Sequence, residues 1–425
     1  MVRQSSNLTT IHTDCFFHRG KCSVSAGLSV PRCLDDAFAV MTSRDTDELF
    51  LSRALDLARQ GIGLTSPNPC VGAVVVDTKG KIIASSSHTY DGLKHAEILA
   101  IEQAREKARG ATLYINLEPC SHQGRTGPCA GALIAAGISR VVASMLDPNP
   151  LVSGQGFAKL RSAGINVSSG LLEEEAKALN ESFAKYIRQH IPLVMLKAAM
   201  TLDGKIAPPP NQSPNLAAGN TTRTAWITGK SARAHVQELR HQSDAILVGV
   251  GTVIADDPLL TDRSGRPRRR PLLRVLLDSR LRLPLESRVA KTAQNDVLVL
   301  CSFAEEKRKK QLLQLGIRVE QLPAANSEGH PDMAAVVRFL GEMEITSLMI
   351  EGGSMVNAAA LSAGIVDKVF LYYAPRILGG TASVPFAGGA GFASNNDAAY
   401  VKSVRLHRFG EDFAVEGYLK DPYAD

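Results

Sequence analysis

The sequence lacks the long apolar run that a membrane-spanning helix requires. Such a helix needs roughly 20 consecutive apolar residues, whereas the longest apolar runs here, 71–76 and 245–250, have the length of a β-strand. We therefore expect a soluble chain without a membrane partner. Residues 1–41 also lack the hydrophobic core of a secretory signal. Cytoplasmic location is the expectation, and organellar import through residues 1–45, read as a disordered or targeting extension, is the alternative.

The cysteines do not form the pattern of a disulfide framework. Their number, seven, is odd, and they are dispersed over a long chain. A reducing compartment is therefore expected. The cysteines are Cys15, Cys22, Cys33, Cys70, Cys120, Cys129 and Cys301. Cys70 and Cys301 have no ligand-like spacing, and we expect them to be buried apolar residues.

No internal repeat and no low-complexity linker divides the chain. With 425 residues, of which 44% are hydrophobic and 21% charged, it has the composition of a globular protein and the length of two domains. We place the first domain at 46–190 and the second at 191–425, joined by a helical stretch at 173–188. The absence of a loose linker predicts that the two domains pack closely.

The net charge of +6 is widely spread, with one dense basic run at 263–274. Four of its arginines, Arg266, Arg268, Arg269 and Arg270, stand among prolines. We expect a solvated loop, with contact to phosphate or nucleic acid as the alternative.

Both halves alternate strand and helix patterns, which predicts two α/β domains. A first helix is expected from Asp47, with an apolar stripe of Leu49, Phe50, Ala54, Leu55 and Ala58. Strands are expected at 71–76, 111–117, 140–145, 192–200, 245–250, 273–278, 296–301, 347–350 and 368–374, and one more strand is expected to include residue 83. Further helices are expected at 95–108, 130–136, 230–242, 303–315, 332–341 and 354–363.

Three residues of the first half have the chemistry of a catalytic zinc site. His95 begins a helix, Cys120 follows a strand and Cys129 begins the next helix. One imidazole and two thiolates occupy three corners of a tetrahedron and leave the fourth for water, whose pKa zinc lowers to about 7. Glu97, two residues after the histidine, is suited to shuttle the proton of that water. The pattern is the His-x-Glu and Pro-Cys signature of zinc deaminases. A lone His-x-Glu would indicate an ordinary helix start; the full set favours the metal.

The spacing between the cysteines points to one family. Eight residues separate them, where the general signature has two. The run 117–129, with 66–69, Val71-Gly72 and 147–150, closely resembles the deaminase part of the bifunctional riboflavin-biosynthesis deaminase/reductase family. The resemblance implies zinc ligands His95, Cys120 and Cys129, with Glu97 as acid/base. His122 and Arg125 either hold substrate or brace their loop.

The second half contains two glycine turns suited to a dinucleotide. Gly249 and Gly251 follow a buried strand, and Gly352-Gly353 precede a helix, where free N–H groups favour phosphate. Alone, such turns are weak evidence. Trp226 could cover a nicotinamide or close a core, and Arg240 could grip phosphate or be a surface cation.

The resemblance extends over about 46–420 and resolves these readings in favour of a reductase site. It rests on 196–205, 226–229, 244–263 and 351–353. It implies contacts to NADPH by Ala199, Trp226, Thr252, Asp256, Ser279 and Gly353. It implies substrate contacts by Lys197, Thr224, Arg240, Leu260, Arg263 and Glu351. One departure is a longer loop before Trp226, over 208–225.

The fold and activity implied by the resemblance are a cytidine-deaminase-like three-layer domain followed by a dihydrofolate-reductase-like domain. The implied substrate is a diaminopyrimidinone carrying a ribosylamine phosphate, which is deaminated and then reduced on its ribosyl chain. A homo-oligomer, dimer or tetramer, is expected, without nucleic acid. Three alternatives stay open: an editing deaminase of nucleotides or nucleic acid, a deaminase with a decayed reductase domain, and a zinc-stapled nucleic-acid-binding protein.

Overall fold

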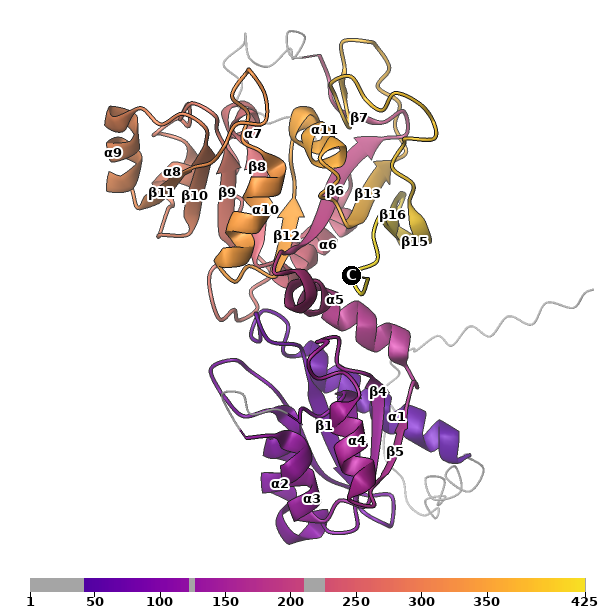
Figure 1. Cartoon of the computed structure of the whole chain (residues 1–425). Helices are drawn as coiled ribbons and strands as arrows, with labels where there is room; N and C mark the ends of the chain where they lie inside the picture. The colour runs from indigo at the N-terminus through magenta and orange to yellow at the C-terminus, as the bar shows by residue number, and fades with distance from the viewer. Residues whose placement is uncertain (1–41, 122–126, 210–225, 425) are drawn as a thin grey trace, which may run out of the picture. The chain divides into compact units, whose positions relative to one another are not determined.

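The computed structural model describes residues 42–121, 127–209 and 226–424. Residues 46–425 form one compact unit, drawn in Figure 1. The expected extension 1–45 lies almost wholly outside the described residues. Within the described part, no helix combines the length and the apolar character needed to cross a membrane.

A five-stranded mixed sheet forms the centre of the N-terminal half. Its order is β2-β1-β3-β4-β5. β1 runs antiparallel to β2 and β3, and β4 and β5 continue parallel to β3. The strands are β1 (Gly72–Val76), β2 (Ile82–Ser87), β3 (Thr112–Leu117), β4 (Arg140–Met145) and β5 (Asn166–Ser169).

Helices cover both faces of this sheet because the side chains of a strand alternate between faces. Ala73 and Val75 of β1 pack in a core with α2, α3 and α4, whereas Val74 and Val76 pack against α1. Figure 1 shows α2, α3 and α4 in front of the sheet. The helices are α1 (Ser43–Arg59), α2 (Ala96–Ala104), the 3₁₀ turn η2 (Arg105–Ala108), α3 (Cys129–Ala136), α4 (Gln155–Ser162) and α5 (Glu173–Gln189). The half is thus a three-layer domain.

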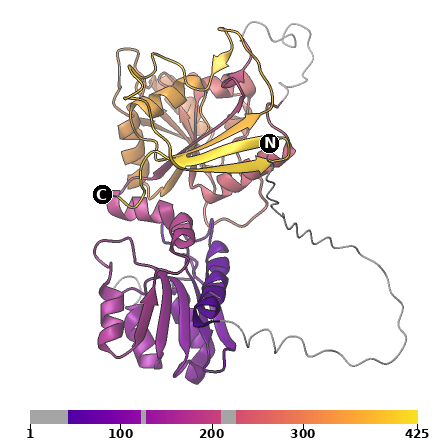
Figure 2. The same cartoon turned by 90° about the vertical axis from the view of Figure 1, so that its right-hand side faces the viewer.

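A nine-stranded sheet forms the C-terminal half, in the order β11-β10-β9-β8-β12-β6-β13-β16-β15. Neighbours from β11 to β13 are parallel, and the last two strands form an antiparallel hairpin that faces the viewer in Figure 2. The strands are β6 (Leu193–Thr201), β8 (Ala245–Gly249), β9 (Leu273–Leu277), β10 (Val297–Cys301), β11 (Ile317–Gln321), β12 (Ser347–Ile350), β13 (Lys368–Ala374), β15 (Lys402–Phe409) and β16 (Asp412–Tyr418). β7 (Lys205–Ala207) and β14 (Val384–Pro385) pair separately.

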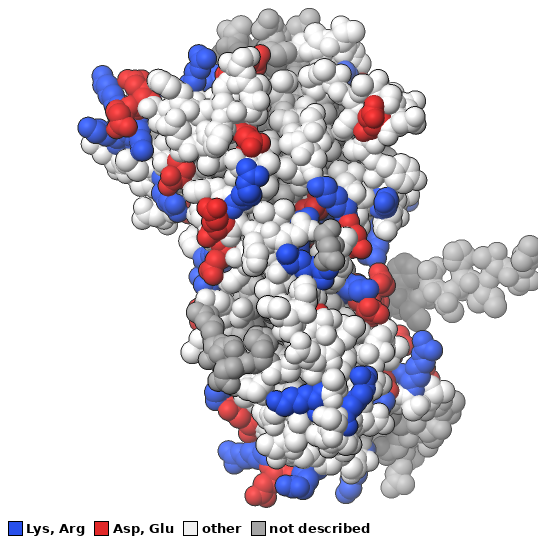
Figure 3. Space-filling model, viewed as in Figure 1, with Lys and Arg blue, Asp and Glu red and all other residues white. Residues whose placement is uncertain are grey.

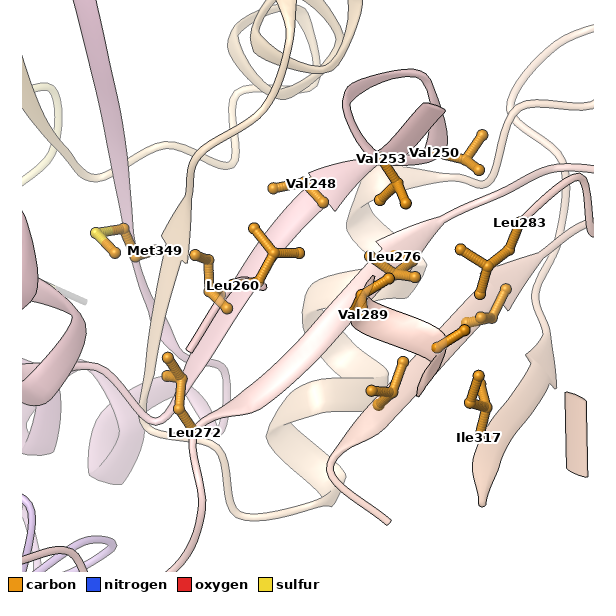
Figure 4. Close-up of a cluster of buried hydrophobic side chains, with 14 of the residues drawn as sticks. Val248, Val250, Val253, Leu260, Leu272, Leu276, Leu283, Val289, Ile317 and Met349 are labelled. Carbon is orange, nitrogen blue, oxygen red and sulfur yellow. The ribbon is translucent and has the colours of Figure 1, made fainter. Parts of the chain in front are cut away.

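Two cores fill the faces of this larger sheet. One contains Val236 of α6, Val289 of α8 and inward residues of β8 to β11 (Figure 4). The other contains Val336 of α10 and Ala360 of α11. The helices are α6 (Lys230–Gln242), α7 (Val250–Asp256), α8 (Arg288–Lys291), α9 (Glu306–Gln314), α10 (Met333–Glu342) and α11 (Ser354–Ser362). This is again a layered α/β domain.

Most elements expected from apolar patterning are present, and several short or exposed ones were missed. The strand at 140–145 has the expected bounds, and α2 ends four residues earlier than expected because a 3₁₀ turn completes it. The sequence reading missed β5, β7, β11, β14, β15, β16, α4, α7 and α8. β15 is mostly exposed and carries no buried alternation. The expected stripe was wrong at Leu49, which is 46% exposed, whereas Leu51 is buried.

The basic run 263–274 is only partly the solvated loop that we expected. Arg266 is exposed, but Arg268 donates to the carbonyls of Arg240, His241 and Ser243. Arg274 lies in β9, fully buried. On the face shown in Figure 3, basic and acidic side chains of the described residues are interspersed. Arg268 and Arg274 therefore brace loops, whereas Arg263 and Arg266 are exposed as expected.

Candidate functional site

The fold brings His95, Cys120 and Cys129 together from three elements. His95 caps the N-terminus of α2, Cys120 follows β3, and Cys129 is the first residue of α3. One donor atom from each lies within 4.8 Å of the other two. His95 Nδ1 is 3.1 Å from Cys129 Sγ and 3.7 Å from Cys120 Sγ. This is the grouping that the sequence predicts.

The donor set suits zinc. Cys129 is fully buried, and its backbone N–H donates to Cys120 Sγ at 3.5 Å. The thiol of Cys129 also donates to Cys120, which lowers the pKa of Cys120 to about 4 and raises that of Cys129. A divalent metal ion removes this asymmetry, because both sulfurs bind it as thiolates. One nitrogen and two soft sulfurs favour zinc and leave a fourth position open.

Glu97 lies in the first turn of α2, beside the three donors. Its side chain is only 3% exposed. Burial raises the pKa of this carboxyl group, although the nearby His95 opposes the shift. Its Oε2 atom has no hydrogen-bond partner among the described residues. A buried polar atom without a partner is costly, so this oxygen is available to a group bound at the fourth position.

Two further groups lie near this centre. The ring of His88 stands 5.5 Å from that of His95 and hydrogen-bonds Asn68 Nδ2 at 3.1 Å through Nε2. Asp147 is buried, and burial raises its pKa to about 7 with help from Glu118 and Cys120. The sequence reading missed His88, since a lone histidine after a strand carries no signal. It singled out 147–150 only through resemblance. His122 and Arg125 lie outside the described residues.

In the C-terminal half, Lys197, Arg240 and Glu351 form one buried cluster. Arg240 Nε and Nη2 donate to the two oxygens of Glu351 at 2.7 and 3.1 Å, and Lys197 Nζ lies 3.4 Å from Oε2. Arg240 is 8% exposed, so the surface-cation reading is wrong. Burial alone would raise the pKa of Glu351, but the charges of Lys197 and Arg240 outweigh it and lower the pKa to about 2.

Parallel pairing explains why residues so distant in sequence meet here. Ile350 at the end of β12 is in register with Leu196 of β6 and with Leu247 of β8. Glu351, which follows the carboxyl end of β12, therefore lies beside Lys197, the next residue of the longer strand β6. In open α/β sheets the carboxyl ends of the strands are where ligands bind.

Some of the residues expected to contact NADPH lie close to this cluster. A Cβ atom on Gly353 would lie 3.3 Å from Thr252 Oγ1, so the two glycine turns meet. Ser354 Oγ is buried and has no partner among the described residues. This cradle fits a phosphate-bearing cofactor. Asp256 ends α7, Ser279 follows β9, and Ala199 lies on β6.

Trp226 is not part of a core, so the alternative prediction that it closes a core is wrong. It is 65% exposed, and the Arg233 guanidinium lies 5.0 Å from its ring centroid. An exposed indole is available to cover a flat ligand. Thr224 lies outside the described residues.

The loop that carries Leu260 and Arg263 is held from two sides by arginines. Arg240 Nη1 donates to Thr261 O at 2.9 Å, and Arg274 Nη1 donates to Leu259 O at 3.1 Å. Leu260 between them is buried and has a φ of 57°. The Arg263 side chain is exposed. The bracing role of Arg274 escaped the sequence reading, which counted it only as part of a basic run.

The two halves match two family models. Residues 44–145 match the cytidine and deoxycytidylate deaminase zinc-binding region, and residues 192–415 match the RibD C-terminal domain. The architecture and site therefore define a zinc-dependent deaminase joined to a reductase.

Relatives and solved structures cover both halves at once. The riboflavin biosynthesis protein RibD of Actinobacillus pleuropneumoniae is 41% identical over 388 residues, 91% of this chain and 98% of that protein. The structure of Acinetobacter baumannii RibD superposes with a TM-score of 0.74 at 33% identity, covering 88% of this chain and 99% of that one. The deaminase/reductase of Thermotoga maritima gives 0.72 at 37% identity, covering 89% and 99%.

The chain belongs to the RibD family of riboflavin biosynthesis proteins. Because the matches span both halves, it is a bifunctional enzyme, a deaminase with a zinc-binding domain joined to an NADPH-dependent reductase. The alternatives of an editing deaminase and of a deaminase with a decayed partner domain are thereby set aside.

The Glu351 cluster predicts a specific acid sensitivity. The pKa of this carboxyl group is about 2 in the fold and 4.5 as an isolated group. Its contribution to stability is therefore complete above pH 4.5 and is lost as the pH falls toward 2. At 1.36 kcal/mol per pKa unit, the loss from about pH 5 to about pH 3.5 is on the order of 1 kcal/mol. Urea unfolding at the two pH values measures the free energy of unfolding of the wild type and of Glu351→Gln. The difference between the two proteins should shrink by this amount at the lower pH, and a difference that does not change with pH would contradict the assignment.

Proposed function

We propose that His95, Cys120 and Cys129 hold the zinc ion of the deaminase and that Glu97 is its proton shuttle. Zinc supplies an acidified water at neutral pH. The closeness of the three donor atoms and the unpartnered Glu97 oxygen support this assignment. Glu97 takes the proton of the attacking water and later delivers it to the departing amino group. Its raised pKa makes the Glu97 carboxylate a stronger base, which favours the first of these steps.

For the reductase, we propose that Lys197, Arg240 and Glu351 bind the substrate, with Thr224, Leu260 and Arg263 from the neighbouring segments. Glu351 is held ionised by two cations, so it accepts hydrogen bonds from a hydroxylated chain. Arg263 has an exposed guanidinium, which suits a phosphate. NADPH is proposed to contact Ala199, Trp226, Thr252, Asp256, Ser279 and Gly353.

The substrate is proposed from the names of the relatives. The Thermotoga maritima protein is described as a diaminohydroxyphosphoribosylaminopyrimidine deaminase and 5-amino-6-(5-phosphoribosylamino)uracil reductase. We infer the same two steps here: hydrolysis of a ring amino group, then hydride transfer to the ribosyl chain to give a ribityl chain. A cytoplasmic homo-oligomer stays a prediction, to be checked by light scattering of the purified protein and by fractionation.

The direct test supplies the diaminopyrimidinone ribosylamine phosphate to the zinc-loaded protein, with and without NADPH. Ammonia should appear in both samples, and nicotinamide absorbance at the NADPH band should fall only where the cofactor is present. Each turnover releases one ammonia and oxidises one NADPH, so the two signals should reach the same amplitude. Ammonia without NADPH oxidation would leave the reductase assignment without support, and no ammonia would remove the deaminase assignment.

The Glu97→Gln variant tests the proton shuttle. It should keep its zinc but lose deaminase kcat by at least about 1,000-fold, within the range for general acid–base catalysis. Zinc content and ammonia release are the measurements. Glu102→Gln, on the same helix but half exposed and paired with Lys94, is the matched control and should behave as wild type. Deaminase turnover retained by Glu97→Gln would remove the proposed role.

The Lys197→Met variant tests the reductase cluster. Loss of one charge-assisted hydrogen bond, worth up to about 3 kcal/mol, should lower reductase kcat/KM by about 100-fold. Deamination in the same protein should be unchanged, which verifies the fold. Lys307→Met, at an exposed position of α9, is the control. An unchanged rate with the deaminated substrate would place Lys197 outside the reductase site.

A further inference from the structure

Glu118 places a buried carboxylate two residues before Cys120. The side chain is 3% exposed. Its Oε2 accepts the backbone N–H groups of Asp147 at 3.1 Å and Gly154 at 2.9 Å, and its Oε1 accepts that of Phe157 at 3.1 Å. Both oxygens are thus engaged by the backbone, and Glu118 is not placed to react with a substrate.

The first turn of α4 lies directly on this residue. A Cβ atom on Gly156 would come within 2.0 Å of Pro119 O and 3.1 Å of Glu118 Oε1. Only glycine therefore permits the contact. On the strand side, the Glu118 N–H donates to Met145 O at 3.0 Å. Glu118 and Pro119 are fixed between the end of β4 and the start of α4.

This arrangement is costly unless the charge is satisfied. A buried ionised carboxylate loses its hydration, and several backbone N–H groups are needed to offset that loss. Here the three donors come from two separate segments, the turn after β4 and the start of α4. The same turn carries Asp147, whose carboxylate accepts Asn149 N–H at 2.9 Å. One side chain thereby ties together the strand end that carries Cys120 and the loop that carries Asp147.

We propose that Glu118 is a positioning residue of the deaminase, which holds Cys120 Sγ where it completes the metal site. The inference rests on the proposed zinc ligands. Metal–ligand distances are tolerated within about 0.2 Å, and residues beyond the ligands that fix their orientation affect metal affinity by about 10–100-fold. Only Pro119 separates Glu118 from Cys120, so a shift of the carboxylate moves the sulfur.

The Glu118→Gln variant removes this restraint with little change in volume. The amide can still accept with its one oxygen, but its NH₂ group must face one of the backbone N–H donors. Opposed donors repel, so the Pro119-Cys120 segment should move away from α4. Zinc affinity should fall by about 10–100-fold, with deaminase kcat reduced when zinc is limiting.

A matched control separates positioning from general loss of stability. Asp47 is also a buried carboxylate of this half, 9% exposed, and it accepts Tyr114 Oη at 2.9 Å and pairs with Arg140 at 2.6 Å. It belongs to the core on the opposite face of the sheet from α3 and α4. Asp47→Asn should therefore destabilise the domain and leave the metal site intact.

The measurements are zinc transfer to a chelator and the visible d–d spectrum of the cobalt-substituted protein, which reports ligand geometry independently of turnover. Glu118→Gln should release zinc faster and shift or weaken the cobalt bands, whereas Asp47→Asn should match wild type in both. Reductase activity with deaminated substrate should be normal in each, which shows that the chain is folded. If Glu118→Gln is not recovered folded, Glu118→Asp, which keeps the charge but withdraws it by one methylene, should show the same changes.

Two results would overturn the inference alone. In the first, the wild type binds zinc and the Glu118 variants have the same zinc affinity and cobalt spectrum as the wild type. In the second, Asp47→Asn loses as much zinc affinity as Glu118→Gln, so that Glu118 has only a stabilising role. A wild type that holds no zinc or cobalt at His95, Cys120 and Cys129 would instead overturn the proposed metal site, and the inference with it.

Discussion

The alignment of parallel strands is the constraint on which both sites depend. Parallel neighbours are held in register, so residues far apart in the sequence become neighbours when they follow paired positions. In the C-terminal half, the register of β12 with β6 and β8 brings Glu351 to Lys197 across 154 positions. In the N-terminal half, β3 and β4 end together, so Cys120 and Asp147 share one edge. Without this register neither cluster would form.

Three buried charged groups of the described residues are each shared among several partners. Glu351 meets two cations, Glu118 meets three backbone N–H groups, and the guanidinium of Arg274 meets Leu259 O, Thr292 and Asp296. Each arrangement offsets the loss of hydration that an isolated ion would suffer. These contacts also reach beyond the paired strands: Glu351 is held by Arg240 of α6, Glu118 by the start of α4, and Arg274 holds the loop at Leu259. The contacts that stabilise each buried charge therefore also hold a neighbouring segment in position.

The two halves of the chain place their candidate site residues on different kinds of secondary-structure element. In the deaminase half, the proposed donors His95 and Cys129 stand at helix N-termini and Cys120 follows a strand; the N-terminus of α3 favours the negative charge of a Cys129 thiolate. In the reductase half, glycine turns at Gly249 and Gly353 begin α7 and α11, and Glu351 of the buried cluster stands two residues before Gly353. Family membership, shown by relatives that span both halves, agrees with this division.

The sequence alone determined the long buried elements and which residues form the candidate metal site. His95, Cys120 and Cys129, with Glu97, were predicted as a group because their residue types and spacing are specific, and the structure places the three donors together; strands such as β4 were predicted because continuous apolar runs leave little choice of structure. Only the tertiary structure decided that Arg240 is buried against Glu351 rather than exposed on its helix, that Arg268 and Arg274 brace loops, and that Glu118 ties Cys120 to α4. These roles depend on partners at least 15 residues away in sequence, as Arg274 and Leu259 show at 15 positions and Arg240 and Glu351 at 111, and local patterning carries no information about such partners.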